Sequence, residues 1–329
     1  MKMHGPRSAV AGFLLLLAAA APPAHGCSIC RCGDPTFNAL GTDVYTQGVF
    51  RISLDWERFD KAQGILSEDG GAPAAARAAA ASDLGREAVV ENRFTTGFSY
   101  TFGERVVAVA RVPWSTRQMS QEGGALSQDA GGPNSSRDLA DPEIYGLVRL
   151  WSSEFAPGLG RRAWISALGG VKTNWGKNDL TAGGQRLDEH LQPGTGSTDW
   201  FGGFSGLYLV DSRSSFFSSV QYRRAGTNDF AYRYGNTAMA NFGYEHKLGK
   251  IWDGALELNF RDAGRDRIDA EGTLDPNTGG RLLYLSPRLI VDLGKGLVGR
   301  LAVQVPVYRD LNGDQRERAV ANVGFTYLF

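Results

Sequence analysis

The stretch "AVANVGFTYLF" (residues 319–329) alternates between two kinds of side chain. Side chains along a β-strand point to opposite faces with a period of two. Val323, Phe325, Tyr327 and Phe329 therefore share one apolar face, while the other face is mostly small or polar. Such a strand suits either the wall of a membrane barrel or the edge of a soluble sandwich.

The same alternation recurs upstream in the chain. "FRISLDWER" (residues 50–58) and "LELNFR" (residues 256–261) each place aromatic or aliphatic side chains on one face and charged or polar ones on the other. The pattern and its turn residues predict about 12 strands. Their expected ranges are 48–59, 87–103, 105–117, 141–154, 161–174, 197–210, 213–225, 234–247, 253–263, 281–293, 297–309 and 316–329.

The connections between these strands decide between the two architectures. Those after even-numbered strands are tight, such as "DSR" (211–213) and "GKG" (294–296), whereas several after odd-numbered strands are long and polar, such as 61–86 and 176–196. Short turns on one side and long loops on the other are typical of outer-membrane barrels, with turns periplasmic and loops extracellular. The sequence therefore predicts an all-β fold, a single closed antiparallel transmembrane β-barrel of outer-membrane type.

Three prolines lie inside the expected strands, at Pro113, Pro287 and Pro306. Each costs a ladder hydrogen bond, and we expect bulges to absorb them. The terminal Phe329 after an aromatic strand also resembles the closing strand of bacterial outer-membrane barrels, which the insertion machinery reads.

The N-terminus has the pattern of a secretory signal peptide. Lys2 and Arg7 precede an apolar run at 9–21, and small residues at 24 and 26 precede Cys27. The apolar run is shorter than the roughly 20 residues that a spanning helix needs, although an N-terminal membrane anchor is the alternative. The expected division is a signal peptide at 1–26, a periplasmic Cys-rich N-terminal segment at 27–47 and an outer-membrane β-barrel at 48–329.

Charge and histidine content narrow the function classes. The formal net charge is zero, which argues against a nucleic-acid partner. Of the histidines beyond the leader, His190 lies in a long loop and His246 near a short turn, and neither lies mid-strand beside a lipid-facing serine. Carboxylates such as Asp55 and Glu57 alternate along a strand among arginines, so we expect them to form ion pairs. The sequence thus predicts no enzyme.

Charged residues fall on the face opposite the aromatic one, which predicts a polar lumen. The interior positions comprise ten basic and seven acidic residues. Either they pair and fill a narrow bore, or they line a narrow path that slightly favours anions. The predicted pore-lining residues are Glu91, Arg93, Arg111, Arg117, Glu143, Arg149, Lys172, Glu257, Arg261, Arg288 and Arg300. The remaining interior positions are Arg51, Asp55, Glu57, Arg223, Glu245 and Asp292.

Three stretches in the middle of the chain carry a resemblance to a known family. They are "LGGVKTNWGKND" (168–179), "LQPGTGSTDWFGGFSGLY" (191–208) and "YRYGN" (232–236). Together they resemble the bacterial transporter-like outer-membrane family named for meta-pathway phenol degradation. The likeness extends more weakly from residue 141 to the end, and 171–176 lacks the family's proline. The resemblance implies an outer-membrane channel for small molecules, with outer-membrane lipid and a small solute as partners, and no binding residue is carried over from it.

All three cysteines lie in "CSICRCGD" (residues 27–34), and they allow three readings. Cys27 at the mature start could carry a lipid anchor. Cys27 and Cys30 could form a disulfide in an oxidising compartment. Cys27, Cys30 and Cys32 could converge on one soft metal ion, whereas a c-type haem needs His where Arg31 stands. The leading function is passage of a small solute, and the alternative is a barrel that anchors this segment for a periplasmic protein partner.

Overall fold

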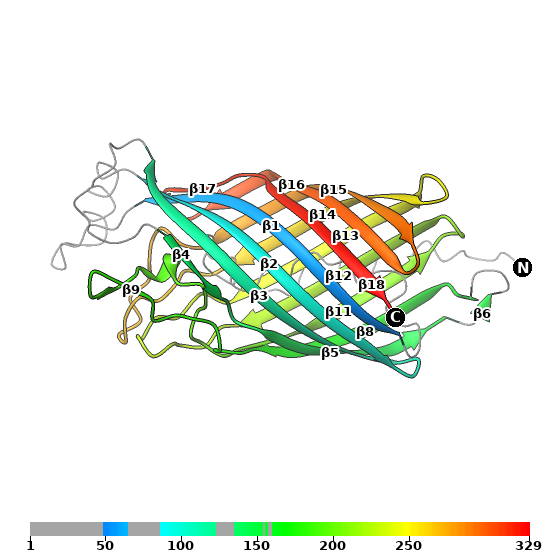
Figure 1. Cartoon of the computed structure of the whole chain (residues 1–329), viewed down its shortest axis with the longest axis horizontal. Coiled ribbons are helices and arrows are strands. Elements are labelled where there is room, and N and C mark those ends of the chain that lie inside the picture. Colours follow the sequence, from blue (N-terminus) through cyan, green and yellow to red (C-terminus); the bar gives the residue numbers. More distant parts are fainter. Residues whose placement is uncertain (1–48, 65–85, 123–134, 154, 157–159) are drawn as a thin grey trace, which may run out of the picture.

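The computed structural model describes residues 49–64, 86–122, 135–153, 155–156 and 160–329. Twelve long strands form one closed antiparallel barrel (Figure 1), so the predicted fold class is confirmed. The wall consists of β1 (Phe50–Gly64), β2 (Arg86–Phe102), β3 (Val106–Glu122), β5 (Glu143–Ser152), β8 (Ala163–Lys172), β11 (Asp199–Leu209), β12 (Ser214–Arg224), β13 (Thr237–Lys247), β14 (Trp252–Ala263), β15 (Gly280–Gly294), β16 (Leu297–Leu311) and β18 (Val320–Leu328).

Each strand pairs with its neighbours in chain order, and β1 closes the barrel by pairing with both β2 and β18. The closing register places Leu54 opposite Phe325 and Asp55 opposite Gly324. At the end of the seam the Phe329 amide donates to the carbonyl of Phe50 over 2.9 Å, and the two rings lie 5.5 Å apart. Closure leaves no sheet edge in the wall, as lipid requires.

Several short elements accompany the wall strands. β4 (Ser135–Leu139) pairs with β3 inside a predicted loop, and β17 (Gln315–Glu317) pairs with β1, so the expected strand 316–329 is divided at 318–319. β1 and β3 each run five residues beyond their expected ends. The hairpins are β6 (Phe155–Ala156) with β7 (Gly160–Arg161), and β9 (Thr181–Ala182) with β10 (Gln185–Arg186). The 3-10 helix η1 spans Glu189–Leu191, and no helix of the described residues is long and apolar enough to cross a membrane.

The prolines are accommodated in different ways. Pro306 lies at a register shift between β15 and β16, where a bulge absorbs it as expected. Pro113 lies where the partner of β3 changes from β5 to β4, and its carbonyl accepts from the Ala140 amide. Pro287 pairs with Leu256 on β14 without a bulge, so the expectation was wrong there.

Burial alternates along the strands, as a barrel with a lipid-facing exterior requires. Large apolar side chains remain exposed on the outer face, among them Leu54, Phe98, Trp114, Leu256 and Leu301. The residues between them point inward and are mostly polar or charged. The polar side chains thus form the core, which inverts the usual soluble pattern.

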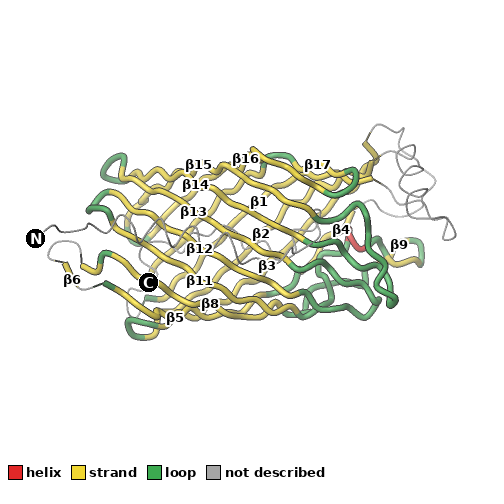
Figure 2. The backbone as a smooth tube through the Cα atoms, turned by 180° about the vertical axis from the view of Figure 1, so that it is seen from behind, coloured by secondary structure: helices red, strands yellow, loops and turns green. Residues whose placement is uncertain are grey.

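The two ends of the barrel differ. One carries the long connections, and we call it the long-loop end; the other carries the tight turns and both the start of β1 and the end of β18, and we call it the short-turn end (Figure 2). The connections that enter the long-loop end include 173–198, 225–236 and 264–279. The short-turn end has connections as brief as Lys295–Gly296.

Gly324 gives a test of the closing seam. A Cβ there would lie 2.2 Å from Asp55 Oδ1 and 3.0 Å from Arg300 Nη2, two atoms joined by a 2.7 Å ion pair across β18. We expect Gly324→Ala to lower the free energy of unfolding by about 1–3 kcal/mol through overpacking. Unfolding in denaturant, followed by tryptophan fluorescence, measures it. Gly202→Ala is the matched control because its Cβ would have its nearest neighbour at 3.5 Å; equal stability of the two variants would contradict the prediction.

Candidate functional site

The connection 173–198 folds into the long-loop end of the barrel. Its helix η1 lies among the loops there (Figure 2), and all three of its residues are buried. Asp188 caps the helix, since its carboxylate accepts from the His190 amide over 2.8 Å. We call residues 188–192 the tip of this loop.

The tip is tied to one side of the wall. Arg117 on β3 donates from Nη1 to the carbonyls of His190 and Gln192, at 3.2 and 2.5 Å. Ser136 on β4 donates to the carbonyl of Leu191. Arg117 is itself held by Glu91, 3.0 Å from its Nε. Arg117 thus holds the tip through backbone carbonyls, so these contacts do not depend on which side chains residues 190 and 192 carry.

The tip is also tied to the connection between β12 and β13. Asn228 Nδ2 donates to Glu189 Oε1 over 2.6 Å, and the Tyr234 hydroxyl donates to the Glu189 carbonyl over 3.3 Å. The rings of His190 and Tyr232 lie 6.5 Å apart, edge to face. β3 and β12 are separated by β5, β8 and β11 along the wall. The tip therefore bridges the barrel mouth.

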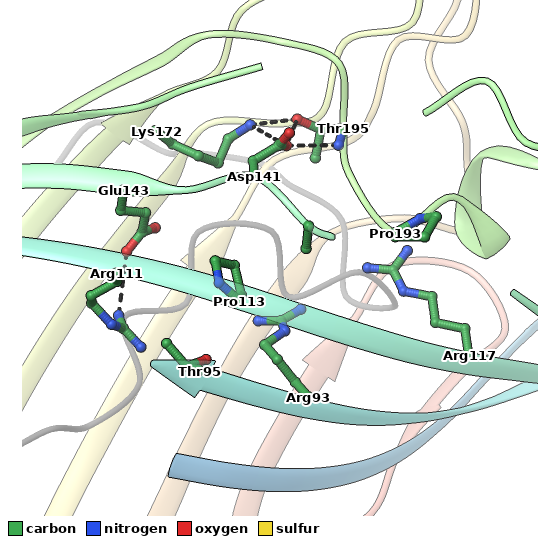
Figure 3. A pocket seen from close by; sticks show the side chains of 11 residues that line it. Arg93, Thr95, Arg111, Pro113, Arg117, Asp141, Glu143, Lys172, Pro193 and Thr195 are labelled. Atoms are coloured by element: carbon green, nitrogen blue, oxygen red, sulfur yellow. Dashed lines mark hydrogen bonds and ion pairs between the residues drawn. The ribbon is translucent and has the colours of Figure 1, made fainter. Parts of the chain in front are cut away.

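The base of the same loop is held by a buried lysine. Figure 3 shows Lys172 with Asp141 and Thr195: Lys172 Nζ lies 2.9 Å from Asp141 Oδ2 and donates to the Thr195 hydroxyl. The same Nζ lies 3.3 Å from Asp199 Oδ2 and donates to the carbonyl of Ser197 over 2.8 Å. All three charged side chains are at most 4% exposed. Asp141 also accepts from the Thr195 amide, over 2.7 Å. The cluster fixes where 173–198 leaves and rejoins the wall.

Elsewhere in the interior, single carboxylates bridge two cations. Glu143 lies 3.3 Å from Arg111 Nη1 and 2.5 Å from Arg223 Nη2, although Arg223 is on β12, three strands from β5. Glu91 lies 2.9 Å from Arg93 Nη2 in addition to its contact with Arg117. Such pairing satisfies charges that would be costly in isolation, and it narrows the bore.

Near the seam, Glu317 on β17 also bridges two cations. It lies 3.3 Å from Lys61 Nζ and 2.7 Å from Arg261 Nη2, and it accepts from the Tyr284 hydroxyl. Its carboxylate is fully buried.

A small cavity remains beneath the loop, with about 450 Å³ of empty space, part of it open to solvent. Figure 3 shows side chains of β2, β3, β5 and β8 around it, with Pro193 and Thr195 from the loop. The lining residues are Arg93, Thr95, Arg111, Pro113, Arg117, Ala140, Asp141, Glu143, Lys172, Pro193 and Thr195.

The structure places all of the predicted pore-lining residues on the inward face. Six of them meet around or beside the cavity, namely Glu91, Arg93, Arg111, Arg117, Glu143 and Lys172. The others lie elsewhere in the interior: Glu257 pairs with Arg288, Arg261 with Glu317, and Arg300 with Asp55, while Arg149 lies over the ring of Trp164. Cys27, Cys30 and Cys32 lie outside the described residues.

Sequence reasoning missed several members of these clusters. Lys61 adds one interior cation, while Asp141, Asp199 and Glu317 add three carboxylates. The connections bury three more carboxylates, Glu189, Asp266 and Asp275, so the expected excess of interior cations is lost among the described residues. Asp199 could have been found, because it shares the inward parity of Phe201 on β11. Asp141 could have been found too, because it shares the parity of Glu143 in the expected strand 141–154. Glu317 could not, because it has the parity of the outward-facing Val323 and lies before the break at 318–319.

His246 has a serine neighbour that the sequence did not reveal. Ser214, the first residue of β12, has its Oγ 2.9 Å from His246 Nδ1. Hydrogen bonds from the Arg213 amide, and from the Ser214 amide and hydroxyl, lower the pKa of Asp211. The Ser214–His246 contact joins the first residue of β12 to β13 beside the short turn 210–213.

Asp275 in the connection 264–279 gives a pH-dependent prediction. Burial raises the pKa of Asp275, so the folded state binds its proton more tightly than the unfolded state does. The ionised carboxylate therefore destabilises the loop at neutral pH, and the penalty disappears below the unfolded pKa of about 3.9. We expect Asp275→Asn, which keeps the acceptor for the Asn277 amide, to raise the melting temperature at pH 7 and to leave it unchanged near pH 3. A melting temperature raised equally at both pH values would contradict this cause.

Comparisons with known proteins agree with the fold. The COG4313 outer membrane channel from Pseudomonas putida F1 is similar in structure, with a TM-score of 0.57 and 9% identity over 86% of this chain and 96% of that one. The translocator domain of the autotransporter NalP from Neisseria meningitidis follows with a TM-score of 0.46 and 11% identity, covering 85% of this chain and 88% of that one. The CymD monoaromatic hydrocarbon channel has a TM-score of 0.42 and 7% identity, covering 86% of this chain and 89% of that one.

No protein-family model matches the chain, and no curated protein does. The expected relation to the meta-pathway family therefore has no support from sequence comparison. The structural likeness to outer-membrane barrels shows the fold.

Proposed function

We propose that this protein is an outer-membrane channel that passes a small solute through a narrow, charged lumen, with the long-loop end facing the cell exterior. The observation that carries the proposal is the cavity beneath the loop tip, inside a closed barrel whose outer wall is apolar. A barrel with such a wall is stable only in a bilayer. The loop tip narrows the bore without removing the space under it.

Two further points support this function. Charged side chains are tolerated in a membrane barrel where they face water or a partner, and the interior here offers both. The resemblance to the transporter-like family and the fold of the COG4313 channel agree with solute passage. Around the cavity, four cationic side chains against two carboxylates favour anions over cations in the path.

Planar bilayer recording of the purified full chain tests the proposal. We expect single-channel steps far smaller than those of 16–18-stranded porins, which leave a wide aqueous channel. In a KCl gradient the reversal potential should have the sign of weak anion preference. Complete absence of conductance would favour a filled barrel whose role is to anchor the N-terminal segment for a partner.

The N-terminal division stays part of the proposal. We place a cleaved signal peptide at 1–26 and the Cys-rich segment 27–47 in the periplasm, attached to the first strand. Intact mass and thiol counting, with and without a chelator, separate the three roles of the cysteines. Acyl mass on Cys27 means a lipid anchor, two missing thiols in both conditions mean a disulfide, and thiols exposed only by the chelator mean a soft metal ion.

A further inference from the structure

We infer that the cavity beneath the loop tip is a binding subsite for a compact oxyanion, such as a small carboxylate, that solutes occupy on their way through the barrel. The inference rests on the proposed function and adds to it a ligand class. A channel with such a site is saturable, whereas a simple polar pore is not.

The lining of the cavity is rich in hydrogen-bond donors. Among its charged side chains four are cationic, and two are carboxylates. Arginine and lysine only donate, and a carboxylate only accepts. The cationic lining residues are Arg93, Arg111, Arg117 and Lys172.

The two lining carboxylates are already occupied by the protein. Asp141 accepts from the Gly176 amide on Oδ1 and from Lys172 and Thr195 on Oδ2. Glu143 takes a guanidinium on each oxygen. Their oxygens already accept hydrogen bonds from the wall and the loop base. Neither carboxylate is therefore available to accept a hydrogen bond from a solute.

Two buried polar atoms that border the cavity have no hydrogen-bond partner among the described residues. They are the hydroxyl oxygen of Thr95, which is 2% exposed, and Nε of Arg111, which is 8% exposed. Leaving a buried donor unsatisfied costs free energy, which a ligand that accepts would recover. A ligand with acceptor oxygens therefore complements the Thr95 hydroxyl and Arg111 Nε.

The register makes these two residues diagonal neighbours on the inward face. Thr95 on β2 lies opposite Pro113 on β3, with Arg111 two residues along β3 on the same inward face. Diagonal neighbours of this kind in a sheet are within reach of long side chains. Arg93, two residues from Thr95 along β2, completes a cationic rim, as Figure 3 shows. A carboxylate or similar oxyanion has the oxygen geometry to accept from the guanidinium and the hydroxyl at once.

The expected ligand is small. The cavity is bordered by Pro193 and Thr195 of the loop and by the side chains of β2, β3, β5 and β8. We therefore choose acetate and inorganic phosphate as probes, with methylammonium as a cation of similar size to acetate.

The test uses the full chain in planar bilayers bathed in KCl. Acetate or phosphate should reduce the chloride current with a saturating concentration dependence, whereas methylammonium chloride should not. Thr95→Val removes the hydroxyl at nearly constant volume and breaks no hydrogen bond among the described residues. We expect it to raise the half-saturating concentration of the active probe about ten-fold, as loss of one hydrogen bond to a charged group requires.

Thr96→Val is the matched control, because Thr96 is the next residue on β2 and points outward. It should leave the half-saturating concentration unchanged. Saturation by neither oxyanion, or equal behaviour of Thr95→Val and the parent protein, would overturn the inference while leaving channel function intact. If the parent protein shows no conductance, the proposed function fails instead. Calorimetric titration of the same probes into the detergent-solubilised protein then still decides whether the subsite exists.

Discussion

Lys172→Met should lower the free energy of unfolding by about 3–5 kcal/mol, the cost of leaving a buried charge without its partner. The lysine is 4% exposed and stands between Asp141 and Asp199, each 3% exposed. Without the ammonium group two carboxylates face each other in the interior. Denaturant unfolding of the protein in lipid vesicles, followed by circular dichroism, measures the change.

An exposed ion pair on the same loop provides the control. Lys177 lies 2.7 Å from Asp179, but both side chains are about half exposed. Lys177→Met should therefore leave the free energy of unfolding nearly unchanged, because solvent screens an exposed pair. Equal losses in the Lys172 and Lys177 variants would show that burial does not decide the effect.

A second substitution separates charge from packing at Lys172. Asp199→Asn keeps the acceptor for Ser197 and the Gly226 amide on Oδ1 while removing the charge that faces Lys172. The double variant Lys172→Met/Asp199→Asn should be more stable than Lys172→Met alone. If it is less stable, the lysine acts through its aliphatic chain and the electrostatic account is wrong.

Removal of the loop tip should raise the single-channel conductance several-fold. The Gly194 amide donates to the Lys177 carbonyl over 2.8 Å, so these residues already lie side by side. Replacing residues 178–193 by Asn-Gly joins them with a two-residue turn. The Lys172 cluster stays in place, while η1 and the backbone carbonyls that Arg117 holds are removed.

The same recordings need a control within the loop. Thr181 and Gln185 are exposed on the β9–β10 hairpin, away from the tip contacts. Changing both to alanine should leave the conductance unchanged. An unchanged conductance after removal of the tip would mean that the bridged arginines and carboxylates below it set the resistance.

The barrel itself follows from the sequence because its signals are local. Period-two alternation and the contrast of short and long connections predicted the strand count and every wall strand, with ends a few residues off. β4 was not predicted because "SSRDL" has no apolar face, and it forms by pairing with Trp114–Gln118 of β3. The inward face of the charged residues could also be predicted from parity.

The site could be predicted only in part. Arg111 and Glu143 were expected to face inward, but no local pattern joins Glu143 to Arg223, which lies 80 residues away. The position of the loop tip could not be predicted, because its contacts use backbone carbonyls, such as those of His190 and Gln192, which carry no sequence pattern. Tertiary proximity of polar groups depends on closure of the whole barrel, and alternation alone does not encode it.

The closing seam also constrains the order of assembly. Arg300 and Asp55, 245 positions apart, meet only when β18 reaches β1. Contacts of such sequence separation form late, since a long loop must close first. Until then the ion pairs Asp55–Arg300 and Lys61–Glu317 across the seam cannot form, and the strand edge is open. These charged groups therefore oppose insertion into the hydrocarbon before the barrel closes. Pairing of β18 with β1 should be the step after which the chain stays in the bilayer. Variants of the seam should accumulate as intermediates in which β1 and β18 are not fully paired.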